Sequence, residues 1–315
     1  MNNEKPRLSI GMPVYNAEKY IEFAIDSILT QTFDDFEIII SDNASIDKTE
    51  KICRKYVKKD KRIKYYRNKV NLGGPRNYNR VFELSSGDYF KWAAHDDLLA
   101  PEYLQKCVQV LDSDLSIVMS HSQVNRIDEN GVLLGNYDDH TLFRLSSFKP
   151  HERFADMISS RNTCWAIHAV VRRNTLAQTP LHGDYIDADR NLLAEIALIG
   201  RIHEIQEHLF FRRDHPQAYT SIYYKKSNLI QDYRRQLMWW TGSRRKRLIV
   251  LPHWKNFLEY FKSINRVRLE LPEKMHCYRE VGNWLIREHG ADLMKLDLKD
   301  EFLFWRLKLN KINRS

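Results

Sequence analysis

The sequence contains few cysteines, and no two of them lie close together. Its four cysteines, at positions 53, 107, 164 and 277, are spread over 315 residues and form no CxxC pair. This excludes a short disulfide-stapled scaffold and gives no support to a zinc or redox site built on cysteine. We expect free thiols in a reducing compartment.

Long apolar runs, repeats and low-complexity tracts are also missing. No stretch approaches the roughly 18 consecutive apolar residues that a membrane span requires, and the first apolar run is too short for a signal peptide. A content of 43% hydrophobic and 29% charged residues is typical of a folded globular chain. The sequence therefore predicts a cytoplasmic enzyme or binding protein.

Positive charge is concentrated near the C-terminus. Residues 221–315 contain 21 Lys and Arg against 10 Asp and Glu, a net charge of +11, whereas residues 1–220 carry −2. The basic run 244–247 lies near Trp239, Trp240 and Trp254. Such a segment is either a solvated helical face or a contact with an anionic surface. We expect peripheral membrane contact rather than nucleic acid, because no nucleic-acid-binding motif is present.

Buried strands alternate with amphipathic helices through the first half of the chain. Strands are predicted at 7–14, 36–41, 63–67, 88–94 and 116–124, and helices at about 20–29, 47–57, 75–84 and from 101. This spacing predicts an α/β fold, a mostly parallel sheet with helices on both faces. Further on we expect a hairpin near 129–131, a helix at about 150–159, a strand at 165–173, a helix at 188–200 and two short strands at 201–205 and 208–213. A domain boundary near 215–225 would separate a domain at 1–220 from a helical region at 221–315.

Three polar clusters follow predicted strands. They are residues 13–16, residues 41–45 and the triplet 95–97, which reads His-Asp-Asp. Ligands of open α/β sheets gather at the carboxyl ends of parallel strands. The adjacent carboxylates of Asp96 and Asp97 repel each other unless a cation or hydrogen-bond donors offset the repulsion, and Mg²⁺ or Mn²⁺ suits such oxygen ligands. Helix capping is the alternative role for these acids.

Three sequence blocks carry a family resemblance. They read MPVYNAEKYIEFAIDSILTQTFDDFEIIISDNASIDKT, NLGGPRNYN and SSGDYFKWAAHDDLLAPEYL. Together they resemble the opening half of the family 2 glycosyltransferases, inverting enzymes of the GT-A fold that use nucleotide-sugar donors. The match is strong over about residues 7–110 and looser to about 215.

The resemblance implies where the donor binds. Pro13, Tyr15 and Asp42, with Asn16 in the same block, would hold the base of a UDP- or dTDP-sugar. Asn71, Gly73 and Asn79 would pass along the ribose and diphosphate, with Asp96 at the ribose or sugar. Tyr78 stands where many relatives have Arg, so Arg76 or Arg80 would supply the positive charge.

The resemblance also implies the metal and the catalytic base. Asp97 would bind Mn²⁺ or Mg²⁺ directly, stabilising the departing diphosphate. His215 would return to the metal or diphosphate, unless it is a surface histidine. Asp189, at the head of the helix at 188–200, would be the base that deprotonates the acceptor hydroxyl, with Asp184 and Asp187 as rivals and helix capping as the alternative.

Acceptor and setting are less constrained by the sequence. Trp165 and His168 would line the acceptor site or else lie in the core. The expected reaction is inverting transfer to a hydroxyl of a glycan or lipid-linked acceptor, in surface polysaccharide or other glycan biosynthesis; a homodimer is left open. The alternatives are a sugar nucleotidyltransferase, which would need a glycine-rich basic loop after the first strand, and a non-catalytic scaffold of the same fold. No GxGxxG follows that strand, which argues against a dinucleotide oxidoreductase.

Overall fold

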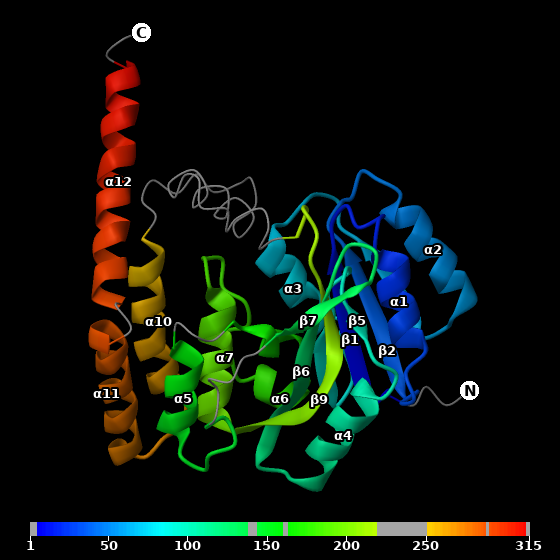
Figure 1. Ribbon diagram of the computed structural model, residues 1–315, viewed down its shortest axis with the longest axis horizontal. Helices are drawn as coiled ribbons and strands as arrows, with labels where there is room; N and C mark the ends of the chain where they lie inside the picture. Colours follow the sequence, from blue (N-terminus) through cyan, green and yellow to red (C-terminus); the bar gives the residue numbers. More distant parts are fainter. Residues whose placement is uncertain (1–4, 138–143, 160–162, 219–250, 288–289, 313–315) are drawn as a thin grey trace.

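The computed structural model describes residues 5–137, 144–159, 163–218, 251–287 and 290–312 (Figure 1). The proposed boundary at 220/221, the basic run 244–247, Trp239 and Trp240 lie outside these ranges. Figure 1 shows a central sheet with helices on both sides, and a helical C-terminal part at one end of the molecule.

The first half of the chain forms the predicted parallel unit. Strands β2 and β1 are buried along their whole length, as expected for parallel strands covered on both faces. Strand order is β3-β2-β1-β4, all parallel, with Leu8 paired to Phe36 on one side and to Tyr89 on the other. The elements are β1 (Leu8–Val14), α1 (Ile21–Leu29), β2 (Phe36–Asp42), α2 (Thr49–Lys59), β3 (Ile63–Arg67), α3 (Gly74–Glu83) and β4 (Tyr89–Trp92).

Beyond β4 the sheet becomes mixed. The order continues β4-β8-β6-β9-β5, with β7 paired to β6, so the described residues form one sheet of nine strands. β8 is antiparallel to both of its neighbours, whereas β6 and β9 are parallel. The elements here are β5 (Leu98–Leu99), α4 (Tyr103–Ser113), β6 (Ile117–Ile127), β7 (Leu133–Tyr137), α5 (Pro150–Ile158), β8 (Val170–Arg172), α6 (Arg173–Leu176), α7 (Ala188–Ile199) and β9 (Arg201–Arg213).

Two predicted strand assignments were wrong. Residues 165–173 are not one strand: Trp165–His168 form the 3₁₀ helix η1, and only Val170–Arg172 pair in the sheet. Ala166, Ile167, Ala169 and Val170 are all buried, and an apolar run buried on every side has no period that separates strand from helix. The two short strands expected at 201–205 and 208–213 are one strand, β9, whose pairing with β6 shifts register near its middle. Polar side chains at that irregularity made the sequence look interrupted.

Each face of the sheet has its own hydrophobic core. Helices α1, α2 and α4 cover one face, where Ile10, Ile25 and Leu104 are fully buried. Helices α3, α5 and α7 cover the other face, and α10 (Pro252–Arg266) and α11 (Leu271–Arg287) pack outside them, with Ile264 and Val281 fully buried in the same core.

The described part of the C-terminal region, from residue 251 onward, is helical, as predicted. The last helix, α12 (Gly290–Ile312), extends past the body of the molecule at the end where the chain terminates (Figure 1). Among the described helices, none is both long enough and apolar enough to cross a membrane.

Candidate active site

The loops after β1 and β2 are fastened to each other at the carboxyl edge of the sheet. Asn16 and Ala44 both adopt positive φ angles, 50° and 63°. The Asn16 amide N–H donates to Oγ of Ser45 at 2.9 Å, and its side-chain Oδ1 accepts from the N–H of Ile46 at 3.0 Å. Tyr15 is 46% exposed beside this junction, whereas Pro13 is buried. The first two predicted clusters therefore form one surface with an exposed aromatic ring.

Asp42 is fully buried at the end of β2. Its Oδ2 accepts from the Tyr65 hydroxyl at 2.6 Å and from the Arg67 guanidinium at 3.0 Å, and Oδ1 accepts from the N–H of Ser45 at 2.8 Å. Both oxygens are thus used within the protein. Tyr65 and Arg67 were not predicted from the sequence as site residues. They are two positions apart on β3, the strand next to β2, so both point to the same face of the sheet, and this spacing was the signal that could have identified them.

The turn before α3 is folded against the end of β2. Gly73 has a φ of 88°, the left-handed region that favours glycine. The Asn71 Oδ1 accepts from the N–H of Gly73 at 2.8 Å and from the side chain of Asn43 at 2.9 Å. The N-terminus of α3 therefore opens beside the β2 loop, where its free N–H groups favour an anion such as a phosphate.

Three side chains of α3 that were predicted to lie along the nucleotide-sugar donor have different surroundings. Arg76 is exposed, and Arg80 is half-buried with its Nε unpaired among the described residues. Asn79 uses both polar atoms on the backbone of His182, at 3.0 Å each.

Asp96 and Asp97 lie together with the end of β9. The backbone N–H of Arg213 donates to Oδ1 of Asp97 at 2.9 Å, and the Arg213 Nε donates to the carbonyl of Asp96 at 2.9 Å. Arg213 is 4% exposed. Sequence reasoning missed this residue, although it lies two positions before His215.

The two neighbouring carboxyl groups have opposite pKa shifts. Burial, reinforced by the charge of Asp96, raises the pKa of Asp97. Burial also acts upward on Asp96, but the charge of His95 and the hydrogen bond with His215 outweigh it and lower its pKa. Asp97 is therefore the carboxylate whose negative charge is least compensated.

His215 completes this cluster. Its Nε2 lies 2.9 Å from Oδ2 of Asp96, its ring is 4.6 Å from that of Tyr20, and its buried Nδ1 has no partner among the described residues. No group of three or more metal-ligating side chains occurs in the described part of the chain. The residues fit a divalent ion held by few protein ligands, because the charge of Asp97 is only partly compensated and Nδ1 of His215 has no partner among the described residues; water and diphosphate oxygens would supply the other ligands.

Asp189 occupies the first turn of α7, where the sequence predicted it. It is half-buried, and burial, followed by the charge of Asp187, raises its pKa to about 6. Asp187 precedes the helix with a positive φ of 60°. The rivals Asp184 and Asp187 thus lie on the loop that leads into α7.

Tyr78 is affected by both parts of the candidate site, the metal motif at 95–97 and the predicted base Asp189. Its pKa is raised by burial first and then by the charges of Asp96, Asp97 and Asp189. These acids come from the loop after β4 and from the first turn of α7, yet the charges of all three act on one phenol. The charges of the predicted metal motif and of the predicted base therefore influence the same side chain, at the position noted as unusual in the sequence.

Trp165 and His168 lie on η1, close to this cluster but partly inside the protein. The Arg212 guanidinium lies 4.4 Å from the centre of the Trp165 ring, and the His168 ring stacks on Phe210 at 5.6 Å. Burial, followed by the charge of Lys91, lowers the pKa of His168 to about 4. His168 is therefore neutral at physiological pH.

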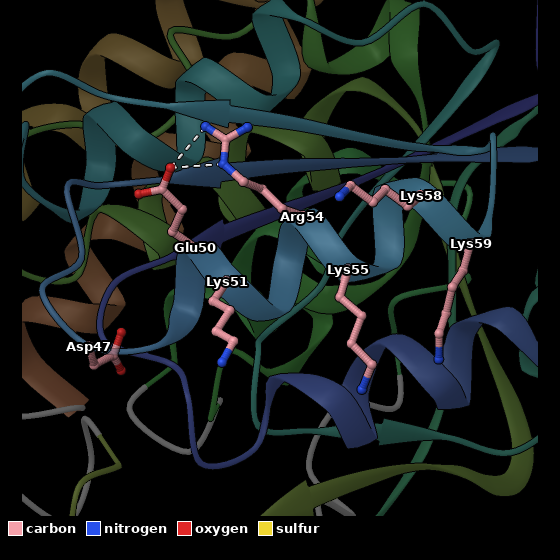
Figure 2. Close-up of a pocket in the computed structure, with 7 residues that line it drawn as sticks. All are labelled: Asp47, Glu50, Lys51, Arg54, Lys55, Lys58 and Lys59. Carbon is pink, nitrogen blue, oxygen red and sulfur yellow. Dashed lines mark hydrogen bonds and ion pairs between the residues drawn. The ribbon is translucent and has the colours of Figure 1, made fainter.

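A surface groove of about 810 Å³ lies elsewhere, along α2 (Figure 2). Lys51, Arg54, Lys55, Lys58 and Lys59 line it, and Arg54 pairs with Glu50 at 2.8 Å. None of the predicted site residues lines this groove, so it plays no part in the candidate active site.

Comparison with known families identifies the chain. A model described as "Glycosyl transferase family 2" matches residues 9–173. The chain belongs to glycosyl transferase family 2. A relative named an uncharacterized glycosyltransferase, from Methanocaldococcus jannaschii, is 37% identical over 136 residues, which cover 42% of this chain and 47% of the relative. The chain spans about half the length of several curated relatives that it matches.

Solved structures identify the fold of this family 2 chain as GT-A. The TarS structure of Staphylococcus aureus in complex with UDP aligns with a TM-score of 0.54 and 17% identity, covering 91% of each chain. A mannosyltransferase of Pyrobaculum calidifontis, in complex with GDP-Man and Mn²⁺, aligns with a TM-score of 0.51 and 14% identity over 96% of this chain and 87% of that one. At these identities the likeness shows the shared fold.

Proposed function

We propose that this protein transfers one sugar from a nucleotide-sugar donor to a hydroxyl group of an acceptor, with inversion at the anomeric carbon. The observation that supports this proposal is that the charges of Asp96, Asp97 and Asp189 all raise the pKa of one phenol, that of Tyr78. In an inverting transfer, the negative charge on the departing diphosphate must be offset at one position, and a base must accept the proton of the acceptor hydroxyl at another. Two acids of one loop and a separate acid at a helix start meet that need.

The donor would lie across the carboxyl ends of β1, β2 and β4. Tyr15 would pack against the base beside Asn16, Asp42 would support this base site from beneath through its hydrogen bonds to Tyr65, Arg67 and Ser45, and the turn at Asn71 and Gly73 would pass along the ribose and diphosphate. The family resemblance favours UDP or dTDP. The UDP complex of the TarS structure supports the same choice of nucleotide.

A divalent ion, Mn²⁺ or Mg²⁺, would be held by Asp97, with His215 beside it and Asp96 oriented by His215. When bound, the ion would offset negative charge on the departing diphosphate. Arg213 holds Asp97 and Asp96 from the protein side, through its own backbone and side chain. The Mn²⁺ complex of the mannosyltransferase with the same fold supports this assignment.

Asp189 would take the proton from the attacking hydroxyl. A pKa of about 6 leaves it mostly ionised at neutral pH while keeping it more basic than an exposed carboxylate. Trp165 would present an aromatic face to an acceptor sugar, beside His168. The acceptor would be a glycan or a lipid-linked glycan, and the basic C-terminal region would hold the protein at an anionic membrane surface.

A non-catalytic scaffold of the same fold is the competing function. It would have no need for a half-buried Asp189 with a raised pKa opposite a metal motif. Such groups, shifted by burial and by one another, are typical of catalytic sites.

The test is sugar transfer by the full chain with a panel of UDP-, dTDP- and GDP-sugars and Mn²⁺. Asp189→Asn should reduce transfer by at least about 1000-fold while UDP binding persists, since a general base contributes roughly 10²–10⁴-fold. Asp97→Asn should weaken Mn²⁺-dependent UDP binding. Asp60→Asn, on the loop between α2 and β3, is the matched control and should change neither. Transfer retained by Asp189→Asn would remove it as the base.

Membrane contact is tested separately. Vesicles containing anionic lipid should retain the full chain at low salt, and retention should decrease as salt rises because the attraction is electrostatic. Equal retention on neutral vesicles, or none on either, would refute this part of the proposal.

A further inference from the structure

A clasp between α3 and the loop before α7 joins the two halves of the site. We define the clasp as Asn79 and His182. The Asn79 Nδ2 donates to the His182 carbonyl, and the His182 N–H donates to Oδ1 of Asn79, both at 3.0 Å. This reciprocal pair satisfies both polar groups of one backbone residue, as a neighbouring strand would. It connects segments 103 residues apart in the sequence.

The His182 side chain strengthens the same connection. His182 is 7% exposed. Its ring lies 5.0 Å from that of Tyr78 and 4.9 Å from that of Trp92, both in edge-to-face contact. The indole N–H of Trp92 donates to the carbonyl of Tyr78 at 3.0 Å. Trp92 is the last residue of β4 and lies three residues before His95. The loop before α7 therefore packs against the strand end that leads into the metal motif.

The clasped loop adopts backbone angles that need external support. Leu181 and Asp187, which bracket it, have φ angles of 59° and 60°. A bulky residue such as leucine rarely adopts this region, and such a conformation persists only when its surroundings enforce it. Between these two residues the clasp supplies backbone hydrogen bonds. Asp189 follows two residues after Asp187, so the position of the base depends on this loop.

We propose that Asn79 and His182 are positioning residues, which hold loop 181–187 and thereby fix Asp189 relative to Asp96 and Asp97. This inference rests on the proposed function for its consequence in catalysis, and on geometry alone for the clasp itself. It gives Asn79 a role different from donor contact, since its amide is already paired on both sides.

The experiment compares Asn79→Ala with a matched control, Asn265→Ala. Asn265 also uses both ends of its amide, on the Phe261 carbonyl and the Tyr278 hydroxyl at 2.8 Å each, but it lies on α10 and links that helix to α11. Transfer is measured with the sugar nucleotide that gives the highest wild-type rate, and UDP affinity is measured with Mn²⁺ present. We expect kcat to fall about 100-fold in Asn79→Ala, as for a catalytic group displaced by about 1 Å, with UDP affinity nearly unchanged. Asn265→Ala should leave both values at the wild-type level.

The pH profile distinguishes positioning from general destabilisation. Release of loop 181–187 should expose Asp189 to water and move Asp187 away, so the acidic limb of kcat should shift to lower pH in Asn79→Ala. A reduced kcat with an unmoved limb, or a loss of UDP affinity, would overturn the inference and return Asn79 to the donor site. His182→Ala keeps the amide pair but removes the ring packing on Tyr78 and Trp92, so it tests the side-chain part of the clasp: if Asn79→Ala folds poorly, His182→Ala should still lower kcat and shift the acidic limb to lower pH, and an unmoved limb would overturn the inference.

Hydrogen–deuterium exchange tests the clasp without catalysis. Amides of residues 181–189 should exchange at least about 10-fold faster in Asn79→Ala than in the wild type and in Asn265→Ala. Unchanged exchange there would overturn the clasp, whether or not the wild type transfers any sugar. Failure of the proposed function would instead show as a wild-type protein inactive with every sugar nucleotide while the exchange difference persists.

Discussion

Asp189 is the side chain whose ionisation state would govern the proposed transfer. Its pKa is raised to about 6 by burial and by Asp187. A base must be deprotonated to act, so kcat should be constant above about pH 7 and fall about tenfold per pH unit below 6. A rate profile at saturating Mn²⁺, with UDP affinity recorded at each pH, checks this. An acidic limb near pH 4 with intact UDP binding would contradict it.

Lys91 is a second buried group near the site with a shifted pKa. It is 1% exposed in β4, and burial lowers its pKa to about 7. Its Nζ donates to the His168 carbonyl and lies 4.7 Å from the Tyr103 ring centre. Because the unfolded chain binds this proton more tightly than the folded chain, stability should rise with pH between about 7 and 10.5.

Lys91→Met should therefore be more stable than the wild type at pH 6, by about 1–4 kcal/mol, since it removes the cost of a buried charge. The His168 carbonyl would retain the Tyr103 hydroxyl, which donates to it at 3.2 Å. The advantage should shrink toward pH 10, where Lys91 is neutral in the folded state. Urea denaturation at both pH values measures it, and a difference that does not change with pH would contradict the prediction.

At the scale of elements, α7 lies between the sheet and α10. The Asn191 Nδ2 donates to Oδ1 of Asn256 at 2.8 Å, and the buried Glu195 accepts from the Ser263 hydroxyl at 2.8 Å. Arg266 of α10 also pairs with Glu195. The helix that begins with Asp189 is thus fastened to the C-terminal region by buried polar contacts.

Asn256→Ala should destabilise the protein by about 1–3 kcal/mol, because it leaves the Asn191 side chain buried without its partner. Asn256 is 4% exposed, so water cannot readily replace it. Asn265→Ala, at an exposed position of the same helix, should change stability by less than about 0.5 kcal/mol. Urea denaturation of the two variants provides the comparison, and equal effects would argue against a buried link between α7 and α10.

Whole elements differed in how far the sequence predicted them. α1, α2 and α7 carry clear helical periods and lie within a few residues of their expected bounds. The prediction of a strand at 165–173 was wrong because apolar residues that are buried on all sides show no period that separates a strand from a helix. The prediction of two short strands in place of β9 was wrong because the polar residues in the middle of β9 resembled a loop between two strands.

At the scale of the whole molecule, α10 and α11 complete the second core rather than form an appendage. Tyr260, Ile264, Cys277 and Val281 are each at most 1% exposed and share one cluster with α7. The last part of α12 contrasts with them, since Phe302 is 71% exposed.

A chain ending at residue 250 should therefore aggregate or unfold, because it exposes the apolar surface of α5 and α7. A chain ending at residue 301 should remain folded, with a Tm within about 3 °C of the full protein. Soluble yield and thermal denaturation of the two truncations check this expectation. A cooperatively folded 1–250 chain would mean that the C-terminal helices are an independent unit.

The sequence by itself determined the family, the alternating β and α elements and the approximate places of Asp42, Asp97 and Asp189. The elements and the places of Asp42 and Asp97 follow from local features, which are buried runs with a clear period and polar residues directly after strands. The family and the place of Asp189 follow from the resemblance of the sequence blocks. Only the tertiary structure decided that Arg213 donates hydrogen bonds to Asp96 and Asp97, that Asn79 is paired with His182, and that α10 is hydrogen-bonded to α7. Each of these contacts joins residues more than 60 positions apart, and no local pattern records which distant side chain will satisfy a buried polar group.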